Sequence, residues 1–168
     1  MSEQPVPAPE VKDIWEQLES DGPDVGIIMG SESDREVMEA AATELTERAI
    51  TFEMQALSAH RDPRGVAEYA STAALRGVRV IIAGAGMAAA LPGVVAAYSD
   101  LPVIGVPLRS SKSVGGGLDA LLAIAQMPPG VPVACVSVDG ARNAAILAAR
   151  ILAQGGGYPQ APSIQSEQ

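Results

Sequence analysis

The residues best suited to chemistry lie together between positions 58 and 61. His60 is the only histidine among the 168 residues, and Arg61 follows it directly. Histidine is the side chain whose ordinary pKa lies nearest neutrality, so it is the default carrier of protons. Arginine adds a planar, permanently charged fork suited to phosphate or carboxylate. This pair predicts a site that binds an anion and moves a proton, although a surface or packing histidine is an equal alternative from the residues alone.

Two secondary-structure elements must hold this turn in place. The alternating apolar residues Phe52, Met54 and Ala56 predict a strand before it. Asp62 and Pro63 predict the N-cap and the first residue of a helix after it. The connection between strand and helix is therefore very short.

The strand–helix pattern occurs five times along the chain. We expect strands at 25–29, 52–56, 78–83, 102–106 and 131–136. We expect helices at 34–48, 63–76, 118–126 and 141–153, and a further helix that follows the third strand and ends at 97. Short connections between apolar strands require right-handed crossovers and a parallel sheet covered on both faces. The sequence thus predicts a three-layer, flavodoxin-like, doubly wound five-stranded sheet with the order 2-1-3-4-5.

Local signals predict where elements begin and end. Ser33 and Glu36 are spaced as a capping box for the helix at 34–48. Gly77 is expected to end the helix at 63–76.

The chain divides into one domain and two flanking segments. Residues 24–153 form the expected domain. Residues 1–23 form an N-terminal extension with a short amphipathic helix, whose Trp15 we expect to dock on the domain surface. The tail at 154–168 is rich in Gly, Pro and Gln and is expected to be loose or to lie on a neighbouring subunit.

Composition excludes several classes of protein. Hydrophobic residues make up 48% of the chain but aromatic residues only 3%, so the core must consist of Ala, Val, Ile and Leu. The net charge of −9 argues against nucleic-acid binding. Cys135 is the single cysteine, is expected in a buried strand and excludes an internal disulfide. With no apolar run that could span a bilayer and no signal-peptide pattern, we expect a soluble, cytoplasmic protein without a membrane partner.

Polar residues collect after the strands. In a doubly wound sheet the loops after strands 1, 2 and 3 meet at the switch point, so Ser31, Asp34, His60 and Arg61 should converge. Gly30 would allow close approach of an anion to free backbone N–H groups. Ser31 could donate to that anion and Asp34 could accept from ribose hydroxyls. A simple turn and helix cap remains the alternative for this first loop.

Other motifs carry less weight. Gly84 to Ala89 matches a loose dinucleotide fingerprint, but it follows the third strand and lacks the acidic residue, so tight packing explains it better than NAD. Gly115 to Gly117 lacks the Lys and Ser/Thr of a P-loop. No cluster offers three metal ligands. We therefore expect neither NAD nor a catalytic metal.

Several motifs in order resemble one family. The segments are 25–34, 58–61, 81–86, 91–93, 102–107 and 126–128, and the similarity covers about residues 24–153. They resemble the PurE family of purine biosynthesis, the N5-carboxyaminoimidazole ribonucleotide mutases and catalytic subunits of phosphoribosylaminoimidazole carboxylase. The resemblance implies a flavodoxin-like subunit in a homo-octamer. It also implies a cofactor-free carboxylate migration on an aminoimidazole ribonucleotide, with CO2 released and recaptured.

The resemblance also assigns roles to residues. The histidine matching His60 moves the proton, Arg61 and Ser31 face the phosphate, and Asp34 faces the ribose. The substrate-binding residues implied in this way are Gly30, Ser31, Ser33, Asp34, Ser58, Ala59, Arg61, Gly86, Met87, Ala88, Ala90 and Leu91.

The third loop departs from the family pattern. Met87 stands where the family has a glycine, and Ala90 stands where it has a second histidine expected to help place the carboxylate. Three functions follow in order of preference. The first is the mutase, the second is a carboxylase or decarboxylase on a related heterocycle, and the third is a non-catalytic nucleoside-monophosphate binder.

Overall fold

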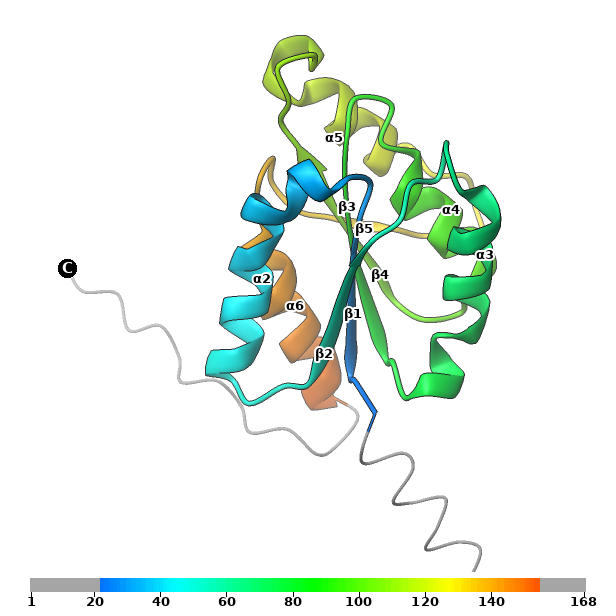
Figure 1. Ribbon diagram of the computed structural model, residues 1–168, viewed down its shortest axis with the longest axis vertical. Helices are drawn as coiled ribbons and strands as arrows, with labels where there is room; N and C mark the ends of the chain where they lie inside the picture. Colours follow the sequence, from blue (N-terminus) through cyan, green and yellow to red (C-terminus); the bar gives the residue numbers. More distant parts are fainter. Residues whose placement is uncertain (1–21, 155–168) are drawn as a thin grey trace, which may run out of the picture.

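Five parallel strands form the centre of the molecule, seen in a computed structural model that describes residues 22–154 (Figure 1). The strands are β1 (Val25–Met29), β2 (Phe52–Ala56), β3 (Val80–Gly86), β4 (Val103–Leu108) and β5 (Ala134–Cys135). Their order is β2-β1-β3-β4-β5, which confirms the flavodoxin-like prediction and its switch point between β1 and β3. The end of β1, Met29, pairs with Ala56 of β2 and Gly84 of β3.

Helices cover both faces of this sheet and complete three layers. They are α2 (Arg35–Glu47), α3 (Pro63–Thr72), α4 (Ala90–Tyr98), α5 (Leu118–Ala125) and α6 (Ala141–Gln154), with 3-10 turns η1 (Glu32–Asp34), η2 (Ala74–Arg76) and η3 (Val114–Gly116). Figure 1 shows α2 and α6 on one face and α3, α4 and α5 on the other.

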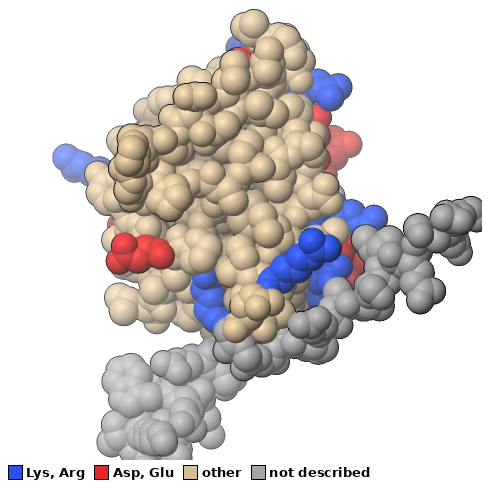
Figure 2. Space-filling view, turned by 180° about the vertical axis from the view of Figure 1, so that it is seen from behind, with Lys and Arg blue, Asp and Glu red and all other residues tan. Residues whose placement is uncertain are grey.

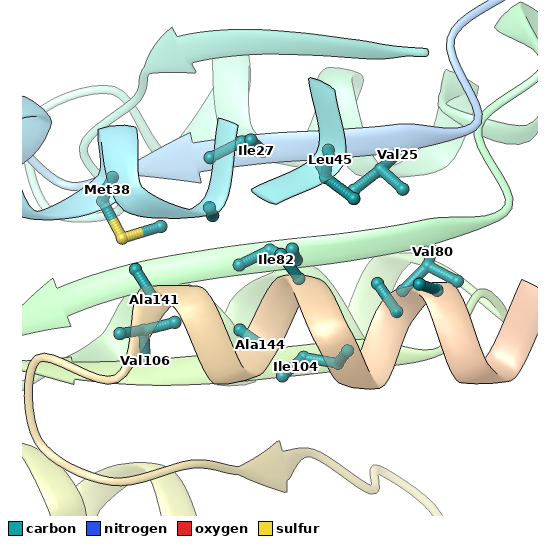
Figure 3. Close-up of a cluster of buried hydrophobic side chains, with 14 of the residues drawn as sticks. Val25, Ile27, Met38, Leu45, Val80, Ile82, Ile104, Val106, Ala141 and Ala144 are labelled. Carbon is teal, nitrogen blue, oxygen red and sulfur yellow. The ribbon is translucent and has the colours of Figure 1, made fainter. Parts of the chain in front are cut away.

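Aliphatic side chains fill most of the core, as the composition predicted, although Met29, Met38 and Tyr69 are buried with them. In the layer under α2 and α6, Met38 and Leu45 of α2 meet Ile27 of β1 and Ile82 of β3, all fully buried (Figure 3). The buried alanines of α6 are Ala141, Ala144, Ala145, Ala148 and Ala149. Because alanine adds so little bulk, α6 packs directly on the β-branched side chains of β3 and β4.

The signals around the second loop are confirmed. Asp62 caps α3, since its Oδ1 accepts a hydrogen bond from the Gly65 N–H at 2.9 Å, and Pro63 is the first helical residue. This cap and the proline fix the angle at which the chain leaves β2 and enters α3. The helix predicted at 63–76 is shorter than expected, because α3 ends at Thr72 and the 3-10 turn η2 follows it. Gly77 ends η2 with φ +96°, a left-handed conformation that glycine adopts without strain.

The predicted capping box at Ser33 and Glu36 is wrong. The η1 turn precedes α2 and is capped by Ser31, whose Oγ accepts from the Ser33 N–H at 3.3 Å. Asp34 takes the N-cap position of α2 without a side-chain cap bond. The extra turn satisfies backbone groups that a capping box would otherwise have served.

The last strand is shorter than predicted, with two paired residues instead of the six at 131–136. Pro132 has no N–H to donate, and the chain before it turns through a Val131 N–H to Pro128 carbonyl hydrogen bond. The prediction that Cys135 is buried is also wrong, because β5 is an edge strand and Cys135 is exposed.

Conversely, β3 extends to Gly86, three residues beyond the prediction, because Ala85 and Gly86 pair with Pro107 and Leu108. The amphipathic segment with Trp15 and most of the tail lie outside the described residues.

Candidate active site

The first two loops meet where β1 and β2 end. The Arg61 Nη2 donates a hydrogen bond to the Gly30 carbonyl oxygen at 3.0 Å. The Gly30 N–H in turn donates to the Gly84 carbonyl of β3 at 3.1 Å. These two bonds bring the first loop, the second loop and β3 together at the switch point, as predicted for Arg61.

Asp34 lies beside the same glycine. A Cβ added to Gly30 would stand 3.8 Å from the Asp34 Oδ2, so only a short space separates this carboxylate from the backbone. Burial raises the pKa of Asp34, although the Ser31 backbone and the positive charge of Arg61 lower it in part. A carboxylate and a guanidinium therefore flank Gly30 and can bind different parts of one ligand.

Two serines shape the loops. The Ser31 Oγ accepts from the Ser33 N–H at 3.3 Å and lies 3.0 Å from the Ser33 Oγ, which leaves its own hydroxyl proton for a ligand. The Ser58 Oγ accepts from the Arg61 N–H at 3.3 Å and the Ser58 carbonyl accepts from the Asp62 N–H at 2.8 Å. Ser58 thus fixes the backbone of the second loop. Ala59, next in that loop, packs against the core.

His60 lies in this fixed loop, exposed, directly before Arg61. Its ring makes no hydrogen bond or ion pair within residues 22–154. An imidazole in this state can accept or release a proton when a ligand is present.

The third loop is tight and strained. The Ala89 N–H donates to the Gly86 carbonyl at 3.0 Å, and Met87 and Ala89 have φ of +55° and +40°. Each left-handed non-glycine residue costs about 1 kcal/mol. Gly86 is required by close packing, because a Cβ there would lie 2.9 Å from the Leu108 carbonyl oxygen.

The residues of this loop differ in how accessible their side chains are to a ligand. Met87 and Ala88 are exposed and Ala90 is half-buried at the start of α4. The Leu91 side chain is only 2% exposed and belongs to the core, so contact with a ligand would have to involve its backbone. In the part of the chain that is described, no hydrogen bond links this loop to Arg61 or Asp34.

Sequence reasoning missed one residue at this edge. Asp139 accepts from the Arg109 N–H at 2.9 Å and pairs with the Arg109 Nε at 3.5 Å, so it ties the loop after β4 to the loop after β5. Its place in the loop between the last strand and the last helix was the available signal. Between residues 22 and 154 no three His, Cys, Asp or Glu side chains gather as metal ligands, and no helix there could cross a membrane.

The fold defines a doubly wound α/β protein, and this edge is its candidate ligand site at the switch point. The model of the AIR carboxylase family matches residues 24–159. The chain is 58% identical over 130 residues to the N5-carboxyaminoimidazole ribonucleotide mutase of Pyrococcus abyssi, which is 77% of this chain and 74% of that protein. It is 55% identical over 141 residues to the phosphoribosylaminoimidazole carboxylase of Schizosaccharomyces pombe, covering 84% of this chain and 25% of that protein.

A solved structure agrees with these relatives. The crystal structure of Treponema denticola PurE superposes with a TM-score of 0.70 at 33% identity, covering 79% of this chain and 81% of that one. The chain therefore belongs to the AIR carboxylase family, to which the PurE resemblance of its motifs had pointed.

Proposed function

We propose that this protein is a mutase of purine biosynthesis that converts N5-carboxyaminoimidazole ribonucleotide into 4-carboxy-5-aminoimidazole ribonucleotide without a cofactor. The observation that carries the proposal is the hydrogen bond of 3.0 Å from Arg61 to Gly30, next to Asp34. It supports one binding site for a sugar phosphate beside the exposed imidazole. The names of the similar proteins supply the reaction.

The reaction is an isomerisation, so its atoms and charges balance without a co-reactant. The bond between the exocyclic nitrogen and the carboxylate breaks, CO2 is released inside the site, and the nitrogen gains a proton that the protonated His60 donates. The ring carbon then forms a new bond to this CO2 and loses its own proton, which His60 accepts. One general acid–base group is sufficient for this exchange if the site holds CO2 close to the ring.

The other residues hold the ribonucleotide. Arg61 and Ser31 bind the phosphate, since a guanidinium and a hydroxyl both donate to its oxygens. Asp34 accepts from the ribose hydroxyls. Gly30 lets the ligand approach the backbone closely, and the small side chains of the third loop leave space for the ring.

Replacing His60 tests the chemistry. His60→Asn keeps a polar side chain of similar size but removes the proton carrier, so turnover should fall by about 10² to 10⁴ while ligand affinity stays within a few fold. The assay follows formation of the ring-carboxylated product from the N5-carboxylated substrate, and calorimetry measures affinity for the product. Unchanged turnover would show that His60 is not the proton carrier.

A carboxylase or decarboxylase is the second candidate. One relative carries the carboxylase name, and Ala90 provides no side-chain group for holding a carboxylate. The same purified protein should then use the uncarboxylated aminoimidazole ribonucleotide with free CO2 faster than the N5-carboxylated substrate. A lower rate with free CO2 than with the N5-carboxylated substrate excludes the carboxylase function.

An apolar surface supports assembly into a homo-oligomer, for which we propose an octamer. Between positions 113 and 138 the chain carries a single charged residue, Asp119. The large apolar side chains exposed there are Val114, Leu118 and Leu122, with exposed fractions of 73%, 51% and 48%. Figure 2 shows a broad area without charged side chains on the side of the molecule that faces away in Figure 1. A patch of this kind normally marks contact with another protein surface.

The substrate also bears on location. A phosphorylated ribonucleotide does not cross a membrane unaided, so we expect the reaction to occur in the cytoplasm.

A further inference from the structure

Two exposed apolar side chains lie at the end of the sheet opposite the candidate site. Among residues 22–154 the large apolar side chains that are exposed are Leu75, Met87, Tyr98, Val114, Leu118 and Leu122. Met87 belongs to the third loop, and the last three belong to the surface proposed for assembly. The remaining two are Leu75 on η2, 86% exposed, and Tyr98 at the end of α4, 55% exposed.

A groove of about 230 Å³ lies between the end of α3 and the end of α4. Its apolar lining comes from Ala70 and Ala74 on one side and from Tyr98 and Leu101 on the other, and serine hydroxyls complete it. Asp100 adds a carboxylate that makes no hydrogen bond or ion pair within residues 22–154. Apolar walls with a free acceptor suit an aromatic ring that has a single N–H donor, which describes an indole.

The chain enters the domain beside this groove. A Cβ on Gly77 would lie 3.2 Å from the Gly22 Cα, and a Cβ on Gly22 would collide with the Arg76 carbonyl oxygen. Figure 1 shows the start of β1 and the end of α3 at the same end of the sheet. Ala74, which lines the groove, and the exposed Leu75 directly precede Arg76. The chain before Gly22 therefore starts within one turn of the groove.

The sequence before this entry supplies a matching apolar face. Apolar residues recur there at helical spacing. They are Val11, Ile14, Trp15 and Leu18. A helix over residues 11–18 would be about 12 Å long, and the link from Leu18 to Gly22 spans up to about 14 Å when extended. Such a helix can therefore reach the groove of its own chain.

We propose that residues 11–18 dock as an amphipathic helix on the groove between the ends of α3 and α4 of the same chain. Trp15 fills the groove between Ala74 and Tyr98, and its indole N–H donates to the Asp100 carboxylate. Leu18, nearest the entry, covers Leu75. The contact removes these apolar side chains from water, and the short link gives the segment a high effective concentration at its own groove.

Trp15 is the only tryptophan, so its fluorescence reports on its own surroundings. In the full-length wild type the emission should lie at shorter wavelength than in protein unfolded in urea, and acrylamide should quench it less. Leu75→Asp places a charge in the contact without disturbing the core, so the emission should shift to longer wavelength and quenching should rise. Thr43→Asp, exposed on α2 across the sheet, is the matched control and should change neither property.

Thermal unfolding tests the same contact through stability. Trp15→Ala removes the ring from the groove and should lower the Tm by about 2–4 °C. In a double-mutant cycle, Leu75→Asp should lower the Tm of wild type but leave that of Trp15→Ala nearly unchanged, because the contact is already lost.

Three results would overturn the proposal. The same emission wavelength in buffer and in urea would show that Trp15 is surrounded by water. A shielded Trp15 that Leu75→Asp does not affect, or additive losses of Tm in the cycle, would show that the segment lies elsewhere. A lower sedimentation mass for Leu75→Asp would show that another subunit occupies the groove.

Discussion

At the scale of single residues, the site depends on the guanidinium of Arg61. It donates to the Gly30 carbonyl. Burial raises the pKa of the nearby Asp34 carboxyl, and the positive charge of Arg61 offsets part of that rise. A fork with several donors can keep this backbone contact and still bind a phosphate with its remaining N–H groups.

Arg61→Lys should therefore weaken ligand binding even though it keeps the charge. An ammonium cannot hold the backbone carbonyl and the phosphate in the same planar geometry, so KM should rise roughly tenfold to a hundredfold. Steady-state kinetics measure the change. Arg64→Lys, on the exposed first turn of α3, is the matched control and should leave KM unchanged.

Asp34 gives a prediction that depends on pH. Its pKa is raised in the folded protein, so its contribution to stability is fully present below its ordinary value of 3.8 and is lost as pH rises through the raised pKa. At pH 7 the charged carboxylate is desolvated at a cost. Asp34→Asn should raise the Tm by roughly 1–3 °C at pH 7 and weaken ligand affinity about tenfold.

Thermal unfolding and calorimetry at pH 7 measure both effects of Asp34→Asn. The gain in Tm should vanish near pH 3, where the wild-type carboxyl is already neutral. A lower Tm at pH 7 would contradict the argument.

At the scale of elements, an ionic cluster joins α2 to α6. Glu44 of α2 is only 4% exposed. Its Oε1 accepts from the Arg48 Nε at 2.7 Å and its Oε2 from the Arg142 Nε of α6 at 2.7 Å. Burial raises the pKa of Glu44, but the hydrogen bonds from Arg142 and Arg48 outweigh it, so the pKa lies below its ordinary value. The layer that packs on one face of the sheet is therefore fixed by charge as well as by alanine packing.

Glu44→Gln should lower the free energy of unfolding by about 1–2 kcal/mol at pH 7, less than for a fully buried pair because Arg142 can turn into solvent. The depressed pKa means that this contribution is present above pH 4.5 and is lost as pH falls through the folded value. Urea unfolding should thus show a difference from wild type at pH 7 that shrinks below pH 4. Glu39→Gln, exposed on the same helix, should show no such difference.

At the scale of the whole molecule, the proposed assembly predicts that another subunit covers the apolar surface around α5. Leu118→Asp with Leu122→Asp places two charges on it and should reduce the mass in sedimentation equilibrium towards that of smaller species. Leu75→Asp is the control, since Leu75 is 86% exposed on η2, outside this surface, and should leave the mass unchanged. A wild-type mass equal to that of one chain would refute assembly altogether.

The sequence by itself determined the strand order, the start of α3 at Asp62 and Pro63, and the glycine, Gly77, at which the helical stretch through η2 stops. These features follow from local causes: hydrophobic periodicity, a side-chain cap, the fixed φ of proline and the freedom of glycine. The position of the loop that carries His60 and Arg61 was predictable for a related reason, because the strand order places it at the same edge of the sheet as the first loop.

Only the tertiary structure decided how those loops touch. Arg61 and Gly30 are 31 positions apart, and Glu44 and Arg142 are 98 apart. Such contacts depend on the register of the strands and on how the helices pack against the sheet, and no local sequence pattern encodes either. The same holds for the left-handed backbone of Met87 and the short length of β5, because both depend on how the neighbouring strands and turns are arranged in space.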